Sequence, residues 1–189
     1  MDWLRASTSR QEFERFVTDR TAPLLRTACL MTGNLTEAED LVQEALLRVA
    51  RHWPKVRGMA YPAAYARQIL VNVALDDAAK RGRRKGELAP AASAGVHDLV
   101  DTRAQRDLCE VDTRDELLGV LATLPARQRA VIVLRYWEDL PEAEVAEVLG
   151  CSTGTVKSTA SRGLARLRAT IRDGSPGQDE QSHDAKTCM

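Results

Sequence analysis

Apolar residues recur at intervals of three and four along almost the whole of this 189-residue chain. A run between residues 36 and 53 shows the pattern most clearly, and similar runs lie at 66–74 and 145–171. Such spacing places apolar side chains on one stripe of a helix. Alternation of Val, Ile and Thr with polar residues, which is typical of a half-buried strand, is nearly absent. The periodicity therefore predicts an all-α fold.

Several residues suggest where the N-terminal helices begin. Ser9 is a plausible cap of a first helix, and Pro23 is expected to open a second one. Thr36 and Glu39 form a capping-box pattern, which predicts that a helix follows and continues to Trp53.

A change of composition divides the chain into two helical domains. Residues 87–116 contain Pro, Gly, Ser, many alanines, and eight acidic against three basic residues. We expect a first small helical domain at 1–86, a flexible and extended acidic linker at 87–114, and a second small domain at 115–173. The polar tail at 174–189 is expected to be disordered.

The strongest local pattern lies between residues 140 and 172. A short apolar helix is followed by Gly150 and by Ser152, which can cap the next helix. That helix has a stripe whose members are Val156, Ala160, Leu164, Leu167 and Ile171. The arrangement is typical of a helix-turn-helix, whose second helix enters the major groove of DNA.

Polar residues on the outward face of this last helix are candidates for DNA contact. They are Thr155, Lys157, Ser158, Ser161, Arg162 and Arg166. Residues 148–172 include five basic residues and no acidic residue, a charge pattern that suits phosphate binding. A solvated helix face is the alternative.

A second basic cluster, at residues 80–85, ends the helix that Pro62 begins. It contains Lys80, Arg81, Arg83 and Arg84, and Tyr61, Tyr65, Arg67 and Asn72 lie upstream. Aromatic rings beside cations suit single-stranded DNA, because bases stack on rings while phosphates bind cations. Core packing of the tyrosines, and compensation of the helix dipole by the cluster, are competing explanations.

The helix at 36–53 presents a mixed charged face. Its polar residues are Glu37, Asp40, Gln43, Glu44 and Arg48. Such a face is usually solvated, but it can also dock a basic partner helix.

Other function classes lack support in the sequence. There is no Gly-rich phosphate loop, nucleophile elbow or cluster with metal-ligand spacing, so we expect neither an enzyme nor a metal or other cofactor. The four cysteines are expected to be free thiols, with Cys29 buried. Without an apolar run of about 18 residues we expect no membrane insertion and a cytoplasmic protein. The formal net charge of zero leaves local basic surfaces available for DNA.

Three stretches together resemble the extracytoplasmic-function (ECF) class of the sigma-70 superfamily of RNA polymerase sigma factors, especially actinobacterial, SigE-like members. AEDLVQEALLRVARHWPKV is similar to regions 2.1–2.2 of that class, and AYARQILVNVALDDAAKRGRRK to regions 2.3–2.4. LPARQRAVIVLRYWEDLPEAEVAEVLGCSTGTVKSTASRGLARLR is similar to region 4.

The resemblance implies partners and residue roles. Core RNA polymerase would be bound through its beta-prime clamp helices and beta flap, with Asp40, Leu41, Gln43 and Glu44 on the clamp side. The residues named above near Tyr61–Arg84 would open and recognise a promoter −10 element, with Asn72 on an unstacked base. Those of the last helix would recognise a −35 element. The linker would thread through the polymerase cleft, and an anti-sigma factor is a further possible partner.

Three positions depart from the family pattern. Tyr65 stands where many members carry Trp, Thr159 where many carry Arg, and Pro141 where Ser or Thr is usual. The main alternative function is a stand-alone helix-turn-helix regulator that binds a duplex operator, although it leaves residues 36–85 unexplained. An arrangement in which the two domains pack together is also compatible with the sequence.

Overall fold

A computed structural model describes residues 2–87 and 111–174, and these residues form an all-α fold. The expected all-α class is therefore confirmed, whereas the expected tail and most of the expected linker lie outside the described residues. The helices of the N-terminal bundle are α1 (Asp2–Thr32), α2 (Leu35–Arg51), α3 (Trp53–Val56) and α4 (Pro62–Glu87). The C-terminal bundle consists of α5 (Val111–Ala122), α6 (Ala126–Ile132), the π-helix η2 (Val133–Trp137), α7 (Glu142–Leu149) and α8 (Thr153–Gly174).

The first helix is longer than expected. α1 begins at Asp2, so Ser9 lies inside it, and Pro23 also lies inside the helix rather than opening another. Proline removes one backbone hydrogen bond, but packing of the following residues against the core outweighs this loss. In the N-terminal half of α1, Phe13 and Phe16 contact the ring of Trp53 at centroid distances of 5.2 Å, and the Trp53 indole donates to the Ser9 carbonyl at 3.0 Å.

The expected capping box of α2 is wrong by two residues. Asn34, rather than Thr36, is the cap, and its side-chain oxygen accepts from the Glu37 amide at 3.0 Å. Asn is at least as good a cap as Thr, because its carbonyl reaches the same unpaired amides of the first turn. The apolar stripe of α2 is buried as expected, with Ala38, Leu41 and Val49 in the core.

The helix-turn-helix junction follows the sequence closely. Gly150 has a φ of 59° at the end of α7, a left-handed conformation that glycine adopts without strain. The Ser152 hydroxyl accepts from the Thr155 amide at 3.2 Å, which confirms Ser152 as a cap of α8. Pro141 precedes α7 and provides no side-chain cap.

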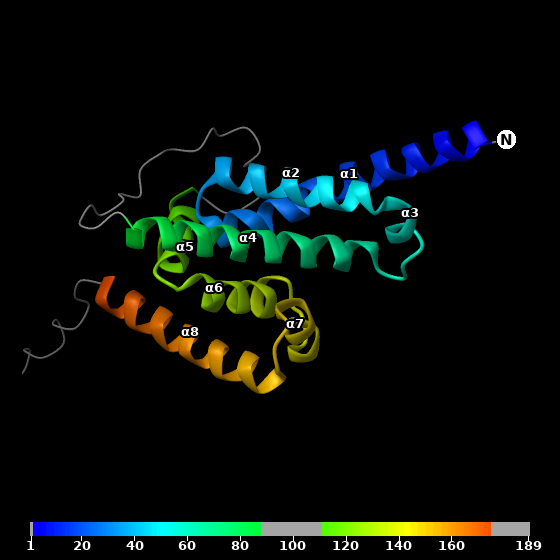
Figure 1. Cartoon of the computed structure of the whole chain (residues 1–189). Helices are drawn as coiled ribbons and strands as arrows, with labels where there is room; N and C mark the ends of the chain where they lie inside the picture. The colour runs from blue at the N-terminus through cyan, green and yellow to red at the C-terminus, as the bar shows by residue number, and fades with distance from the viewer. Residues whose placement is uncertain (1, 88–110, 175–189) are drawn as a thin grey trace, which may run out of the picture.

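The two bundles pack against each other, with α4 between the α1–α2 pair and the layer formed by α6 and α7 (Figure 1). α8 covers the far side of α6 and α7. The buried apolar side chains of both bundles form one continuous cluster, which extends from Leu24 to Ala160. Among the described helices, the compact arrangement that the sequence left open is thus the one observed.

Polar contacts tie the bundles together at two places. The Glu138 carboxylate, just after η2, accepts hydrogen bonds from Thr27 of α1 and from Arg67 of α4, the latter at 3.1 Å. Arg129 of α6 donates to the Met31 carbonyl of α1 at 2.7 Å and to the Ala122 and Leu124 carbonyls at 3.1 Å. Burial, with a smaller effect of the nearby Arg81 charge, lowers the pKa of the Arg129 guanidinium, and Glu37 opposes that shift.

Candidate nucleic-acid interface

The polar face of α8 is open to solvent along its length. All six candidate side chains on it are exposed, namely Thr155, Lys157, Ser158, Ser161, Arg162 and Arg166. Val156 and Ala160 are buried on the opposite side, with Leu164 and Leu167 packed against the core. Ile171, expected in the same stripe, is instead 56% exposed. The described structure therefore groups the six residues on one accessible surface.

Close contact between α8 and α6 holds that surface in place. Gly163 is buried, and a Cβ atom built there would lie 3.1 Å from Cγ1 and 3.3 Å from Cδ1 of Ile132. These distances are shorter than ordinary van der Waals contacts, so the two helices approach each other because Gly163 has no side chain. Gly163 is not a member of the expected apolar stripe, so apolar periodicity gives no sign of its role.

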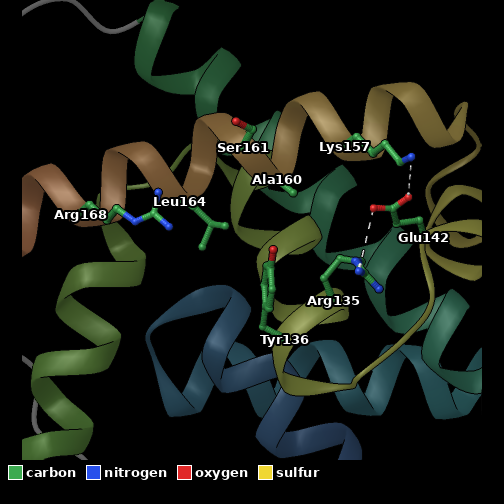
Figure 2. Close-up of a pocket in the computed structure, with 8 residues that line it drawn as sticks. All are labelled: Arg135, Tyr136, Glu142, Lys157, Ala160, Ser161, Leu164 and Arg168. Atoms are coloured by element: carbon green, nitrogen blue, oxygen red, sulfur yellow. Dashed lines mark ion pairs between the residues drawn. The ribbon is translucent and has the colours of Figure 1, made fainter.

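Local hydrogen bonds fix several polar groups of the first turns of α8. The Ser158 hydroxyl donates to the Thr155 carbonyl at 3.1 Å, and Arg162 Nε donates to the Ser158 carbonyl at 3.2 Å. Lys157 instead reaches sideways to Glu142 of α7, with 3.5 Å between Nζ and Oε2 (Figure 2). Thr159, which departs from the family pattern, is only 5% exposed and does not belong to the open face.

The candidate residues of α4 do not all lie on one face. Asn72 is exposed, and Tyr65 is half-buried with its ring packed against the core, so core packing accounts for part of its role. Tyr61, just before α4, is 78% exposed. Arg67 points elsewhere, because five residues rotate a helix by about 140° and so separate it from Asn72. Sequence proximity grouped Arg67 with Asn72, and the helix geometry separates them.

Arg67 is already paired within the molecule. Its guanidinium lies 3.1 Å from Glu138, and both side chains are about four-fifths buried, at 21% and 19% exposed. Its Nε atom is buried without a hydrogen-bond partner in the described structure. The sequence contained no signal for this pair, since 71 residues separate its members. In this arrangement Arg67 is not available to a phosphate.

The basic cluster at the end of α4 is partly accessible. Lys80 and Arg83 are exposed, whereas the side chain of Arg84 lies outside the described residues. Arg81 binds Glu37 of α2 and Asp77 of its own helix, the latter at 3.1 Å. Lys80 and Arg83 are thus the described members of the cluster most open to an anionic ligand.

On α2, too, only some of the candidate residues are accessible. Asp40 and Gln43 are exposed, and Glu44 is paired with Arg48 at 2.7 Å. Leu41, which the resemblance placed at a partner interface, is 6% exposed and belongs to the core instead. Only the polar members of that set are accessible for docking.

Other kinds of site find no support in the described residues. Within residues 2–87 and 111–174, no group of three or more His, Cys, Asp or Glu side chains could hold a metal ion. Cys29 is buried, as expected. Within the same ranges, none of the helices combines the length and the apolar character that crossing a bilayer requires.

The family models that match the chain cover both bundles. The model described as Sigma-70 region 2 matches residues 17–84, and the model described as Sigma-70, region 4 matches residues 114–167. The RNA polymerase sigma-E factor of Streptomyces avermitilis is 36% identical over 160 residues, which is 85% of each chain. The chain belongs to the RNA polymerase sigma factors.

Further similarities specify the class within this family. The ECF RNA polymerase sigma factor SigL of Mycobacterium tuberculosis is 32% identical over 165 residues, which is 82% of this chain and 86% of SigL. The fold is similar to that of the sigma factor RpoE of Bartonella quintana, solved with the anti-sigma factor NepR, with a TM-score of 0.65 and 24% identity. That likeness covers 87% of this chain and 99% of RpoE. This ECF sigma factor thus directs promoter-specific initiation as a subunit of RNA polymerase.

Proposed function

We propose that the two bundles divide promoter recognition between them. Residues 1–86 form the domain that docks on core polymerase and opens the −10 element, and residues 115–173 form the domain that recognises the −35 element. Residues 87–114 connect them, with α5 of the second domain beginning inside this range at Val111, and 174–189 form a tail. A role without catalysis of its own follows from this division, because each helix face named above is suited to binding. The boundaries are supported by the change in composition at residue 87 and by the two separate family matches.

Recognition of the −35 element is assigned to the open face of α8. Lys157, Arg162 and Arg166 provide cations, and Thr155, Ser158 and Ser161 provide hydroxyl groups, all of them exposed. A helix with this pattern can place its first turns in the major groove and its cations on the flanking phosphates. The observation that carries the proposal is the exposure of all six residues on one helix that packs closely on α6.

Opening of the −10 element is assigned to the accessible residues in and just before α4, together with the half-buried Tyr65. Tyr61, Tyr65 and Asn72 lie where an unstacked base can be bound, and Lys80 and Arg83 lie toward the other end of the helix for phosphates. Arg67 and Arg81 join this surface only after they leave Glu138 and Glu37. Arg84 remains a candidate by its place in the sequence.

Docking on the beta-prime clamp helices is assigned to Asp40, Gln43 and Glu44 of α2. These polar residues occupy one accessible side of the helix, while its apolar side packs on α1 and α4. The beta flap is proposed as the second polymerase contact, on the C-terminal domain. An anti-sigma factor is a further partner that we propose from membership of the family.

The experiment that tests the assignment is transcription in vitro with core polymerase on a fragmented genomic library. We expect a defined set of transcripts that depends on the added chain, and aligned start sites return the −10 and −35 sequences together. The full chain should also co-purify with core polymerase. Tight binding to a duplex operator by the chain alone, with no binding to core enzyme, would instead favour a stand-alone regulator.

A further inference from the structure

A pocket of about 250 Å³ lies between η2, the start of α7 and the flank of α8 (Figure 2). Arg135, Lys157 and Arg168 line it from three directions, and Glu142 is the acidic side chain among them. One water molecule occupies roughly 30 Å³ in the liquid, so this volume has room for a phosphate group with some of its water. Three cations and one carboxylate leave the pocket with an excess of positive charge.

The polar groups of the pocket also suit an anion. The Tyr136 hydroxyl points toward α8 and can donate a hydrogen bond to a phosphate oxygen (Figure 2), and Ser161 of α8 also lines the pocket. Arg168 reaches the pocket from the far end, about three helical turns from Lys157. Leu164 of α8 adds an apolar side chain to the lining of the pocket.

In the unbound chain, the Glu142 carboxylate neutralises part of this positive charge. Its Oε2 lies 3.5 Å from Lys157 Nζ, and its Oε1 lies 4.0 Å from an Arg135 nitrogen. Arg135 also donates to the Leu140 carbonyl, which fixes its position at the turn before α7. Arg168 has no ion pair with any described residue, so one cation of the pocket remains uncompensated.

We infer that this pocket binds a phosphodiester group of promoter DNA beside the −35 contact, and that Glu142 acts as a built-in competitor for its cations. The inference rests on the proposed role of α8 and extends it to a second row of residues. Lys157 and Ser161 belong both to the open face of α8 and to the pocket, so the two surfaces are continuous. Backbone phosphates border the groove that a recognition helix enters, which places such a group on the flank of the helix.

Glu142 consequently limits the affinity for DNA. A phosphate must compete with the carboxylate for Lys157, and its charge is repelled by Glu142 at short range. The change Glu142→Gln keeps the shape and removes the charge, so it should raise affinity, whereas Arg168→Gln should lower it. The two substitutions in the same pocket should therefore change the affinity for DNA in opposite directions.

The test measures binding of the full chain to a fluorescein-labelled duplex of random sequence by anisotropy, at several salt concentrations. Exposed charge pairs are worth up to about 1 kcal/mol, so we expect E142Q to tighten binding by about twofold to fivefold. R168Q should weaken it by about the same factor and reduce the salt slope by about one ion. Thermal unfolding followed by circular dichroism verifies that each variant is folded.

Two matched variants control for overall charge. Glu144→Gln removes an acid from the same first turn of α7, and Arg172→Gln removes an exposed cation from α8, but neither residue lines the pocket. We expect each control to change affinity by less than its partner. If E144Q changed the affinity as much as E142Q, or R172Q as much as R168Q, net charge alone would explain the result. That outcome would overturn the proposal of a phosphate-binding pocket.

A further arm separates this inference from the proposed function. The double change K157A/R162A must weaken binding of the same duplex if α8 contacts DNA at all. If that variant binds weakly while E142Q and R168Q bind as the unchanged chain does, the pocket inference fails and the −35 assignment stands. If E142Q and R168Q change only the affinity for core polymerase, the pocket binds an acidic protein segment. That outcome also overturns the proposal that it binds a phosphodiester group.

Discussion

The helices α8 and α4 carry the two sets of candidate DNA residues, and they differ in how much of their polar surface is already occupied. On α8 all six candidates are exposed, and only Lys157 has an ion-pair partner among described residues. On α4, by contrast, Asn72 and Lys80 are open, but Arg67 is held by Glu138 and Arg81 by Glu37. The compact arrangement thus leaves one candidate DNA surface fully accessible, and in the other it pairs two of the cations with carboxylates.

The difference has a physical origin in the packing of the bundles. α4 lies in the middle of the molecule and uses opposite sides for α2 and for α6 and α7, whereas α8 lies at the edge (Figure 1). Recognition of duplex DNA by α8 is therefore compatible with the packed form. Engagement of Arg67 with DNA requires that Glu138, and with it the C-terminal bundle, move away from α4.

The largest expected effect comes from removing two cations from the open surface. The change K157A/R162A should weaken −35 binding by about 2–6 kcal/mol, because each of the two lost contacts to a base or phosphate costs about 1–3 kcal/mol. Electrophoretic mobility shifts with a promoter fragment measure the loss. Binding to core polymerase should persist, and the double change R15A/R20A on α1 serves as the charge control; loss of core binding would contradict the separation of roles.

The next effect concerns the occupied surface. Glu138→Ala leaves Arg67 and Thr27 without their partner, and removal of one member of a charged hydrogen-bonded pair costs about 1–3 kcal/mol. We expect looser packing of the bundles, seen as a larger radius of gyration in small-angle X-ray scattering. Glu147→Ala, at an exposed site on α7, should leave the radius unchanged. An unchanged radius for E138A would mean that apolar contacts alone hold the bundles together.

A smaller effect is expected at the open part of α4. Asn72→Ala should reduce the yield of open complexes by a factor of about 10, equivalent to one lost hydrogen bond of roughly 1.4 kcal/mol. Initial binding to the duplex should change little. Permanganate footprinting separates the two steps, with Gln11→Ala on α1 as the amide control. An undiminished open-complex yield would remove Asn72 from the −10 surface.

The smallest effect tests how firmly α8 is held. Ser152→Ala removes the cap of α8 and should lower the free energy of unfolding by about 1 kcal/mol. Urea denaturation measures it, and Thr153→Ala, one residue further on, should cause no comparable loss. If only T153A lowered the free energy of unfolding, the stabilising cap would be Thr153 and not Ser152.

The local features of this fold could be predicted because they depend on neighbouring residues. Gly150 and Ser152 identify their turn, since a left-handed conformation and a hydroxyl cap are properties of single residues in sequence context. Apolar periodicity likewise identified α2 and α8. Pro23 misled the prediction because a proline is disfavoured inside a helix, but tertiary packing can offset that cost.

The parts that could not be predicted depend on residues far apart in the chain. The residues around Arg67 do not predict its pairing with Glu138. Those around Arg129 do not predict its hydrogen bond to the carbonyl of Met31. Helix rotation explains the remaining differences, because Leu41 and Thr159 each lie within a few residues of exposed positions and yet point into the core. The candidate −35 surface was therefore predicted more completely than the −10 surface.

The pairing of Arg67 with Glu138 has a thermodynamic consequence. A guanidinium in direct contact with a carboxylate cannot at the same time bind a phosphate, so the two partners compete for it. By linkage, the free energy by which packing of the bundles weakens DNA binding at Arg67 equals the free energy by which that DNA weakens packing. On the proposed assignment of Arg67, binding of the promoter strand therefore weakens the packing of the two bundles.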